Sequence, residues 1–200
     1  MRYNGKECQI YGNRDADVYI FCFFHDCTPI VESLKGDYCL IAPVIKDWNS
    51  ELSPWESEGF GGKGEDLEKW ILSTMTSSHH YIIAGYSLGG LFSLWIYGRH
   101  EAFIGCISCS GSLWYPGWLN YLHTINRQGT VYLSLGRKES KTKNKLMCTV
   151  GDNTQETYNY LSLNNTCIYI EENGGHFTEP DQRMIRGFKW LFENLSIFFG

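Results

Sequence analysis

Residues 81–97, YIIAGYSLGGLFSLWIY, join an apolar run, a serine set between glycines and a second apolar run of helical length. The aromatic and β-branched residues of the first run predict a buried strand, and the second run predicts a helix. Gly85 and Gly89 stand two residues before and two residues after Ser87. Side chains at these two positions would collide with the neighbouring strand and helix. The spacing therefore predicts a sharp turn that holds Ser87 at its apex.

Ser87 is the candidate nucleophile of the chain. A helix that begins directly after it would aim free N–H groups and a partial positive charge at the place where a negative oxygen forms during acyl transfer. The N–H of Leu88 is the expected first donor to that oxygen. The simpler interpretation is that the pattern is frequent and the serine only caps a helix. The strand and the helix on either side favour the nucleophile.

His176 is the candidate general base, because a serine hydroxyl needs a group that takes its proton near neutral pH. It follows the apolar run 167–172 in CIYIEENGGHF. There Gly174 and Gly175 permit a tight loop that returns the ring to the end of the sheet. The other histidines end strands or helices, precede a strand or lie in a surface segment, and are expected to be ordinary polar residues: His25, His79, His80, His100 and His123.

The acid that orients the base is expected between Ser87 and His176, after the apolar run 131–136. Glu139 lies three residues past Gly136 in LGRKES, directly beyond that run. Asp152, in TVGDNTQET, is more typical of the amino cap of a following helix. Glu139 is therefore favoured, and a dyad of serine and histidine without an acid is the remaining alternative.

Short apolar runs and helical segments alternate along the whole chain. Strands are expected at 18–25, 38–44, 81–86, 103–109, 131–136 and 167–172, and apolar positions recur with helical spacing at 64–76 and 180–196. This alternation predicts an α/β fold, a mostly parallel sheet covered by helices, with ligands bound at the carboxyl ends of the strands. We find no linker or repeat, and we expect one domain over residues 1–200.

Composition narrows the class of function. The formal charge of −5 over 200 residues disfavours nucleic acid and membrane surfaces as partners. There is no long apolar stretch and no signal peptide at the start, which favours the cytoplasm. Most of the eight cysteines lie in apolar runs, which is typical of buried thiols in a reducing compartment. None has the spacing of a zinc site, so we expect neither a metal nor a cofactor.

Four motifs in this order resemble the esterase family of α/β hydrolases that includes S-formylglutathione hydrolase, the feruloyl esterases and the enterochelin esterases. They are ELSPW at 51–55 followed by FGG, GYSLGG at 85–90, SLGRKES at 134–140 and GGHF at 174–177. The resemblance covers most of the chain and implies an α/β-hydrolase fold without a large lid. It implies the same nucleophile, acid and base: Ser87, Glu139 and His176.

The second oxyanion donor is left open by the sequence. It is expected in the loop after the strand 18–25, as the backbone N–H of Asp26 or Cys27. That loop reads FFHDCTP, which departs from the HGGG-type motif of many esterases. If the loop supplies this donor, the side chains of His25 and Asp26 would orient the loop rather than do chemistry. An unremarkable strand end is the alternative.

Aromatic residues suggest a wall for an acyl or aryl group, although each could equally pack beneath a loop: Trp48, Trp55, Trp114 and Tyr115. The polar segment 45–63 is expected to overhang the site. A basic run could attract an anionic substrate but is more often a solvated face: Arg137, Lys138, Lys141, Lys143 and Lys145. We expect a hydrolase of a small-molecule carboxylic ester. The alternatives are an acyltransferase with the same residues and a non-catalytic binding protein on the same fold.

Overall fold

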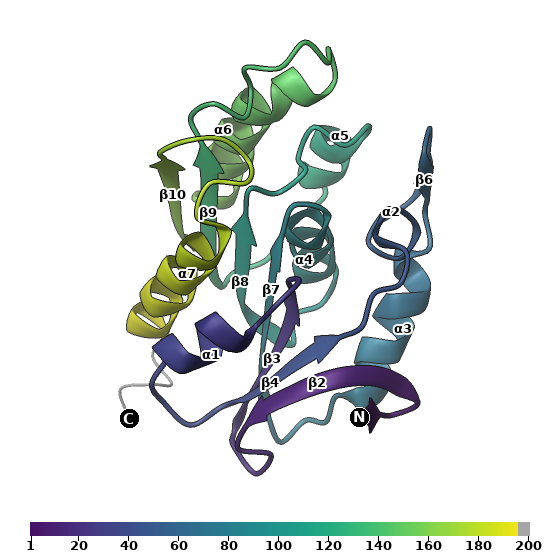
Figure 1. Cartoon of the computed structure of the whole chain (residues 1–200), viewed down its shortest axis with the longest axis vertical. Coiled ribbons are helices and arrows are strands. Elements are labelled where there is room, and N and C mark those ends of the chain that lie inside the picture. The colour runs from purple at the N-terminus through teal and green to yellow at the C-terminus, as the bar shows by residue number, and fades with distance from the viewer. Residues whose placement is uncertain (196–200) are drawn as a thin grey trace.

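A computed structural model describes residues 1–195, in which an eight-stranded sheet lies between two layers of helices (Figure 1). In spatial order the strands are β1 (Arg2–Tyr3), β2 (Lys6–Gly12), β4 (Cys39–Pro43), β3 (Val18–Phe23), β7 (His80–Tyr86), β8 (Phe103–Cys109), β9 (Thr130–Gly136) and β10 (Thr166–Glu172). The strands from β4 to β10 in this order are parallel, and β1 and β2 are antiparallel at one edge. Strands β5 (Glu56–Ser57) and β6 (Phe60–Gly61) form a separate hairpin.

Helices cover both faces of the sheet. They are α1 (Thr28–Ser33), α2 (Trp48–Glu51), α3 (Gly64–Thr74), α4 (Leu88–Arg99), α5 (Trp118–Leu122), α6 (Val150–Leu161) and α7 (Pro180–Asn194), with a 3₁₀ turn at Met147–Thr149. One core lies under α1 and α7, which run side by side in Figure 1, and the other lies under α3 to α6. Side chains alternate between the cores along β3, where Ile20 and Cys22 face α1 and α7 while Phe21 and Phe23 face α4.

The chain order reverses beside β3. Strand β4 pairs with β3 on one side and β7 pairs with it on the other, and the chain then proceeds outward through β8, β9 and β10. Such a switch point leaves a crevice at the carboxyl ends of the strands, where ligands bind in open α/β sheets. Strand β7 ends there at Tyr86, and Ser87 follows.

The six expected strands are confirmed, with ends displaced by up to two residues. Helix α3 ends at Thr74 rather than at residue 76, and α7 begins at Pro180 and ends at Asn194. Residue 196 of the expected last helix lies outside the described residues. The antiparallel strands β1 and β2 were not predicted. In β2 only Cys8 is buried, so its apolar pattern is too weak to identify an edge strand.

The cysteines are free thiols, and six of them are buried: Cys8, Cys22, Cys27, Cys39, Cys106 and Cys109. Over residues 1–195 no helix combines the length and the apolarity that crossing a membrane requires. The same residues contain no group of three or more histidine, cysteine and carboxylate side chains arranged to hold a metal ion.

Candidate active site

Ser87 lies at a strained turn between β7 and α4, as the sequence predicts. Its backbone has φ 59° and ψ −124°, a conformation that residues other than glycine rarely adopt. A Cβ atom on Gly85 would lie 2.2 Å from the backbone of Gly89, and one on Gly89 would lie 2.5 Å from the carbonyl oxygen of Phe23 in β3. The two glycines are therefore required by close backbone contacts on both sides of the serine.

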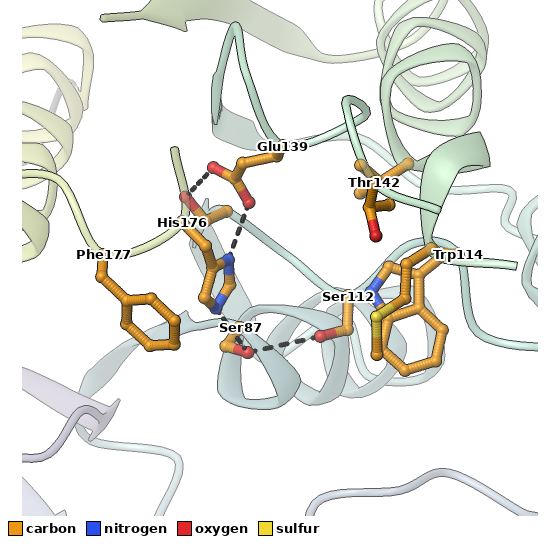
Figure 2. A pocket seen from close by; sticks show the side chains of 10 residues that line it. Ser87, Ser112, Trp114, Glu139, Thr142, His176 and Phe177 are labelled. Atoms are coloured by element: carbon orange, nitrogen blue, oxygen red, sulfur yellow. Dashed lines mark hydrogen bonds and ion pairs between the residues drawn. The ribbon is translucent and has the colours of Figure 1, made fainter. Parts of the chain in front are cut away.

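Three side chains from separate segments meet at this turn (Figure 2). His176 Nε2 lies 3.1 Å from Ser87 Oγ, and His176 Nδ1 lies 2.7 Å from Glu139 Oε2. Ser87 is carried by the β7–α4 turn, Glu139 by the loop after β9 and His176 by the loop after β10. The parallel register of β9 and β10 brings those two loops to the same edge of the sheet.

Glu139 is held as a carboxylate. Its Oε1 accepts three hydrogen bonds, from the Gly136 N–H at 2.7 Å, Ser110 Oγ at 2.8 Å and Arg183 Nη1 at 2.9 Å. Burial raises the pKa of Glu139, but the hydrogen bonds from His176 and from the Gly136 N–H outweigh it, and the pKa lies below its ordinary value. The other oxygen, Oε2, is thereby left as an ionised acceptor for His176.

Arg183 is a buried cation beside the acid, and sequence reasoning missed it. It lies on α7 with its side chain 1% exposed, and its Nη2 donates to the carbonyl oxygens of Asn173 at 3.0 Å and Gly175 at 2.9 Å. The available signal was its spacing, since position 183 falls four residues before the buried Gly187 and eight before the buried Leu191.

Tyr86, the last residue of β7, binds the backbone of the loop that carries His176. Its hydroxyl donates to the backbone carbonyl of His176 at 2.5 Å, and its ring lies 5.4 Å from the imidazole ring. Burial raises the pKa of Tyr86 to about 12, so the phenol stays protonated near neutral pH and remains a donor. The loop that carries His176 is therefore held both by Tyr86 and by Arg183.

A cavity of about 330 Å³ opens beside Ser87. Trp114, Met147, Val150 and Phe177 supply its apolar walls, and Ser112 and Thr142 supply hydroxyl groups. In Figure 2, Trp114 and Phe177 lie on opposite sides of Ser87. Ser112 Oγ is 3.4 Å from Ser87 Oγ, on the side away from His176. This volume is at the small end of the range for small-molecule sites.

Of the four aromatic residues expected to form a wall, only Trp114 lines this cavity. Tyr115 is 1% exposed and packs in the core, where its hydroxyl donates to the carbonyl of Trp55. Trp55 is half-buried and donates through Nε1 to Pro116, and Trp48 packs against the same core. None of residues 45–63 lines this cavity, although Phe60 packs against Trp114 of its wall, and an overhang of the site by this segment stays a prediction.

Asp152 is not the helix cap that the sequence suggests. Helix α6 begins at Val150 with Thr149 as its flanking residue, so Asp152 is an exposed residue in the first turn. A carboxylate there is favourable because the amino end of a helix carries a partial positive charge. The acidic partner of His176 in the structure is Glu139.

The expected oxyanion donors belong to two segments, the first turn of α4 and the loop after β3. Leu88 is the first residue of α4, where N–H groups lack partners within the helix. Phe23, the last residue of β3, lies close to Gly89, and the loop begins directly after it. Within that loop Cys27 is buried, and the exposed Asp26 accepts a hydrogen bond from the Thr28 N–H at 2.9 Å. Donation by Asp26 or Cys27 to an oxyanion stays a prediction.

Comparison with solved structures identifies the fold. The chain superposes on an IroE-like serine hydrolase from Shewanella oneidensis with a TM-score of 0.75 and 14% identity, covering 94% of this chain and 76% of that one. A siderophore hydrolase, EstB from Aspergillus nidulans, gives 0.64 and 15%, covering 94% of both chains. Acyl-protein thioesterase 2 from Zea mays gives 0.57 and 16%, covering 94% and 99%.

No family model and no curated protein sequence matches the chain. The structural likeness therefore shows the fold alone. The chain has the α/β-hydrolase fold, with a mostly parallel sheet flanked by helices and no large lid within residues 1–195.

Proposed function

We propose that the chain is a serine hydrolase that cleaves a small-molecule carboxylic ester through an acyl-enzyme on Ser87. The observation that carries the proposal is the continuous pair of contacts, 3.1 Å from Ser87 to His176 and 2.7 Å from His176 to Glu139, at a strained strand-to-helix turn. A strained serine, a base within hydrogen-bond distance and an ionised acid behind that base together make an activated nucleophile.

The proposed first step forms the acyl-enzyme. The Nδ1–H group of His176 donates a hydrogen bond to Glu139, so the imidazole presents the lone pair of Nε2 to the Ser87 hydroxyl. Ser87 Oγ attacks the ester carbonyl while its proton passes to Nε2, and the Leu88 N–H stabilises the resulting oxyanion. Nε2 then returns the proton to the alcohol that leaves.

The second step needs water at the same base. The His176 side chain is 31% exposed, so a water molecule can reach Nε2, lose a proton there and attack the acyl group. The bond between the acyl group and Ser87 Oγ then breaks, Nε2 returns the proton to Ser87 Oγ, and the carboxylic acid leaves. This access favours hydrolysis over acyl transfer to another acceptor, because a transferase has to exclude water from the acyl-enzyme. The walls formed by Trp114, Met147 and Phe177 suit an apolar acyl or aryl group.

The test is hydrolysis of a series of activated esters that differ in acyl length and include aryl esters and a lactone. We expect the wild-type protein to hydrolyse at least one of them and Ser87→Ala to lose about three or more decades of kcat. Ser162→Ala, at the exposed carboxyl end of α6, is the matched control and should keep full activity. Equal activity of Ser87→Ala and wild type, or no turnover of any ester by either protein, would count against the proposal.

A further inference from the structure

Arg183 bridges three loops beside the site, those that follow β8, β9 and β10. Its Nη1 donates to Glu139 Oε1 at 2.9 Å, and its Nη2 donates to two carbonyl oxygens of the loop that precedes His176. Nη1 also lies 2.7 Å from Ser110 Oγ, and Ser110 follows β8. The planar guanidinium can serve these acceptors together because its donors point in fixed and divergent directions.

The charge of Arg183 is buried, and Glu139 is the one carboxylate paired with it among residues 1–195. The side chains of Arg183 and Glu139 are 1% and 5% exposed, so water screens neither of them effectively. Oε1 of Glu139 faces Arg183, while Oε2 faces His176. One carboxylate therefore has two candidate cations, of which the guanidinium is always charged and the imidazole titrates.

This arrangement has a consequence for the base. Without Arg183, a buried Glu139 would be balanced only by a protonated His176, and a protonated imidazole cannot accept the proton of Ser87. With Arg183 present, the carboxylate is already neutralised when the imidazole is uncharged. Protonation of His176 then adds a second positive charge beside the buried pair of Arg183 and Glu139, which disfavours that protonation.

Among the residues that the structure describes, the other titratable groups near the acid and the base do not supply this balance. Tyr86 of β7 faces the imidazole, and Tyr169 of β10 lies near Glu139. Burial raises the pKa of each phenol to about 12, so both are neutral near pH 7. The next arginine of α7, Arg186, is half exposed and pairs with Glu172 at the surface.

We propose that Arg183 is a positioning residue of the site: it neutralises Glu139 and fixes the loop of His176, so that the imidazole is the uncharged base at neutral pH. The role of this base rests on the hydrolase function proposed above. The balance of charge between Arg183, Glu139 and His176 does not depend on that function, and it can be measured without substrate.

The substrate-free test is an NMR titration of the His176 imidazole in the wild type, Arg183→Met, Arg183→Lys and the surface control Arg186→Met. We expect the midpoint to rise by about one pH unit in Arg183→Met, the scale expected for one nearby charge. Arg183→Lys and Arg186→Met should remain close to the wild type. An unchanged midpoint in Arg183→Met would overturn the proposal.

The kinetic test is the pH profile of kcat on one activated ester. The loss in Arg183→Met should be about tenfold larger near pH 6 than near pH 9, because the neutral fraction of a base falls tenfold per unit below its pKa. A loss of the same size at every pH would show a structural role and contradict the proposal. If no ester is hydrolysed by the wild type, the hydrolase function fails, while the NMR titration still decides the role of Arg183.

Folding is controlled by a second neutral variant, Arg183→Gln, whose planar amide keeps part of the hydrogen bonding. It should show the same upward shift as Arg183→Met. If neither neutral variant folds while Arg183→Lys folds with the wild-type midpoint, Arg183 is required for the fold alone and the proposal is overturned.

Discussion

Glu139→Gln should stop catalysis while the fold is kept, and the structure explains why. The oxygen of the new amide has to occupy the position of Oε1, where the Gly136 N–H and Arg183 Nη1 donate. The amide NH₂ group then faces Nδ1 of His176 and donates to it, so the ring proton moves to Nε2. In this tautomer the imidazole has no lone pair for the Ser87 proton. The reverse orientation would point NH₂ at two fixed donors.

The expected loss is up to about four decades of kcat, the scale observed when an acid of this kind is replaced by its amide. The cost in stability is smaller, on the order of 2 kcal/mol, because Arg183 loses its charge partner but keeps its carbonyl partners. For a chain of this size that cost lowers the thermal midpoint by about 4–8 °C.

The assay compares kcat on one activated ester for wild type, Glu139→Gln and Asp152→Asn, well below every thermal midpoint. Asp152→Asn is the matched control and should change kcat little, because Asp152 is exposed in the first turn of α6. A large loss in the Asp152 variant beside a small one in the Glu139 variant would refute the assignment. Small losses in both would indicate a dyad of Ser87 and His176.

Three further predictions concern pH and substrate binding. Ester hydrolysis should rise with pH through one ionisation near neutrality, because His176 has to be neutral to accept a proton. His176→Ala should abolish activity and His25→Ala should keep most of it, and a flat profile with an active His176 variant would contradict this. The pKa of Glu139 lies below its ordinary value of 4.5. The ionised carboxylate should therefore stabilise the fold above pH 4.5, and this stabilisation should disappear as the pH falls through the lowered pKa. The thermal midpoint should then fall more on acidification in wild type than in Glu139→Gln. Phe177→Ala should raise KM for apolar esters several-fold with little change in kcat, because the ring is 90% exposed in the cavity wall; an unchanged KM would exclude Phe177 from substrate binding.

The parts of the fold and site that could be predicted from the sequence are those set by local pattern. Buried parallel strands appear as short apolar runs, and the site residues follow such runs because loops after parallel strands meet at one edge. The glycines around Ser87 were predicted from sterics, and the contacts of 2.2 Å and 2.5 Å confirm that reasoning. The contact of Glu139 with His176 agrees with its place directly after β9.

The parts that could not be predicted depend on packing between distant segments. Arg183 appears in sequence as one polar residue of an amphipathic helix, and its burial follows only from the way α7 packs beside the loops after β9 and β10. Aromatic identity does not say whether a ring faces a core or a cavity, and for this reason Tyr115 was expected in the site but lies in the core. Phe177 lines the cavity and was not predicted, because one aromatic residue in a short loop has no periodic pattern that shows where its ring points.

The central claim is that Ser87 is an activated nucleophile. The most direct measurement is reaction of the wild-type chain with a fluorophosphonate, followed by mass mapping of the modified peptide. We expect one adduct on Ser87, formed much more slowly in His176→Ala because the hydroxyl then lacks its base. An adduct on another serine, or labelling of Ser87 at the same rate in wild type and His176→Ala, would contradict the account.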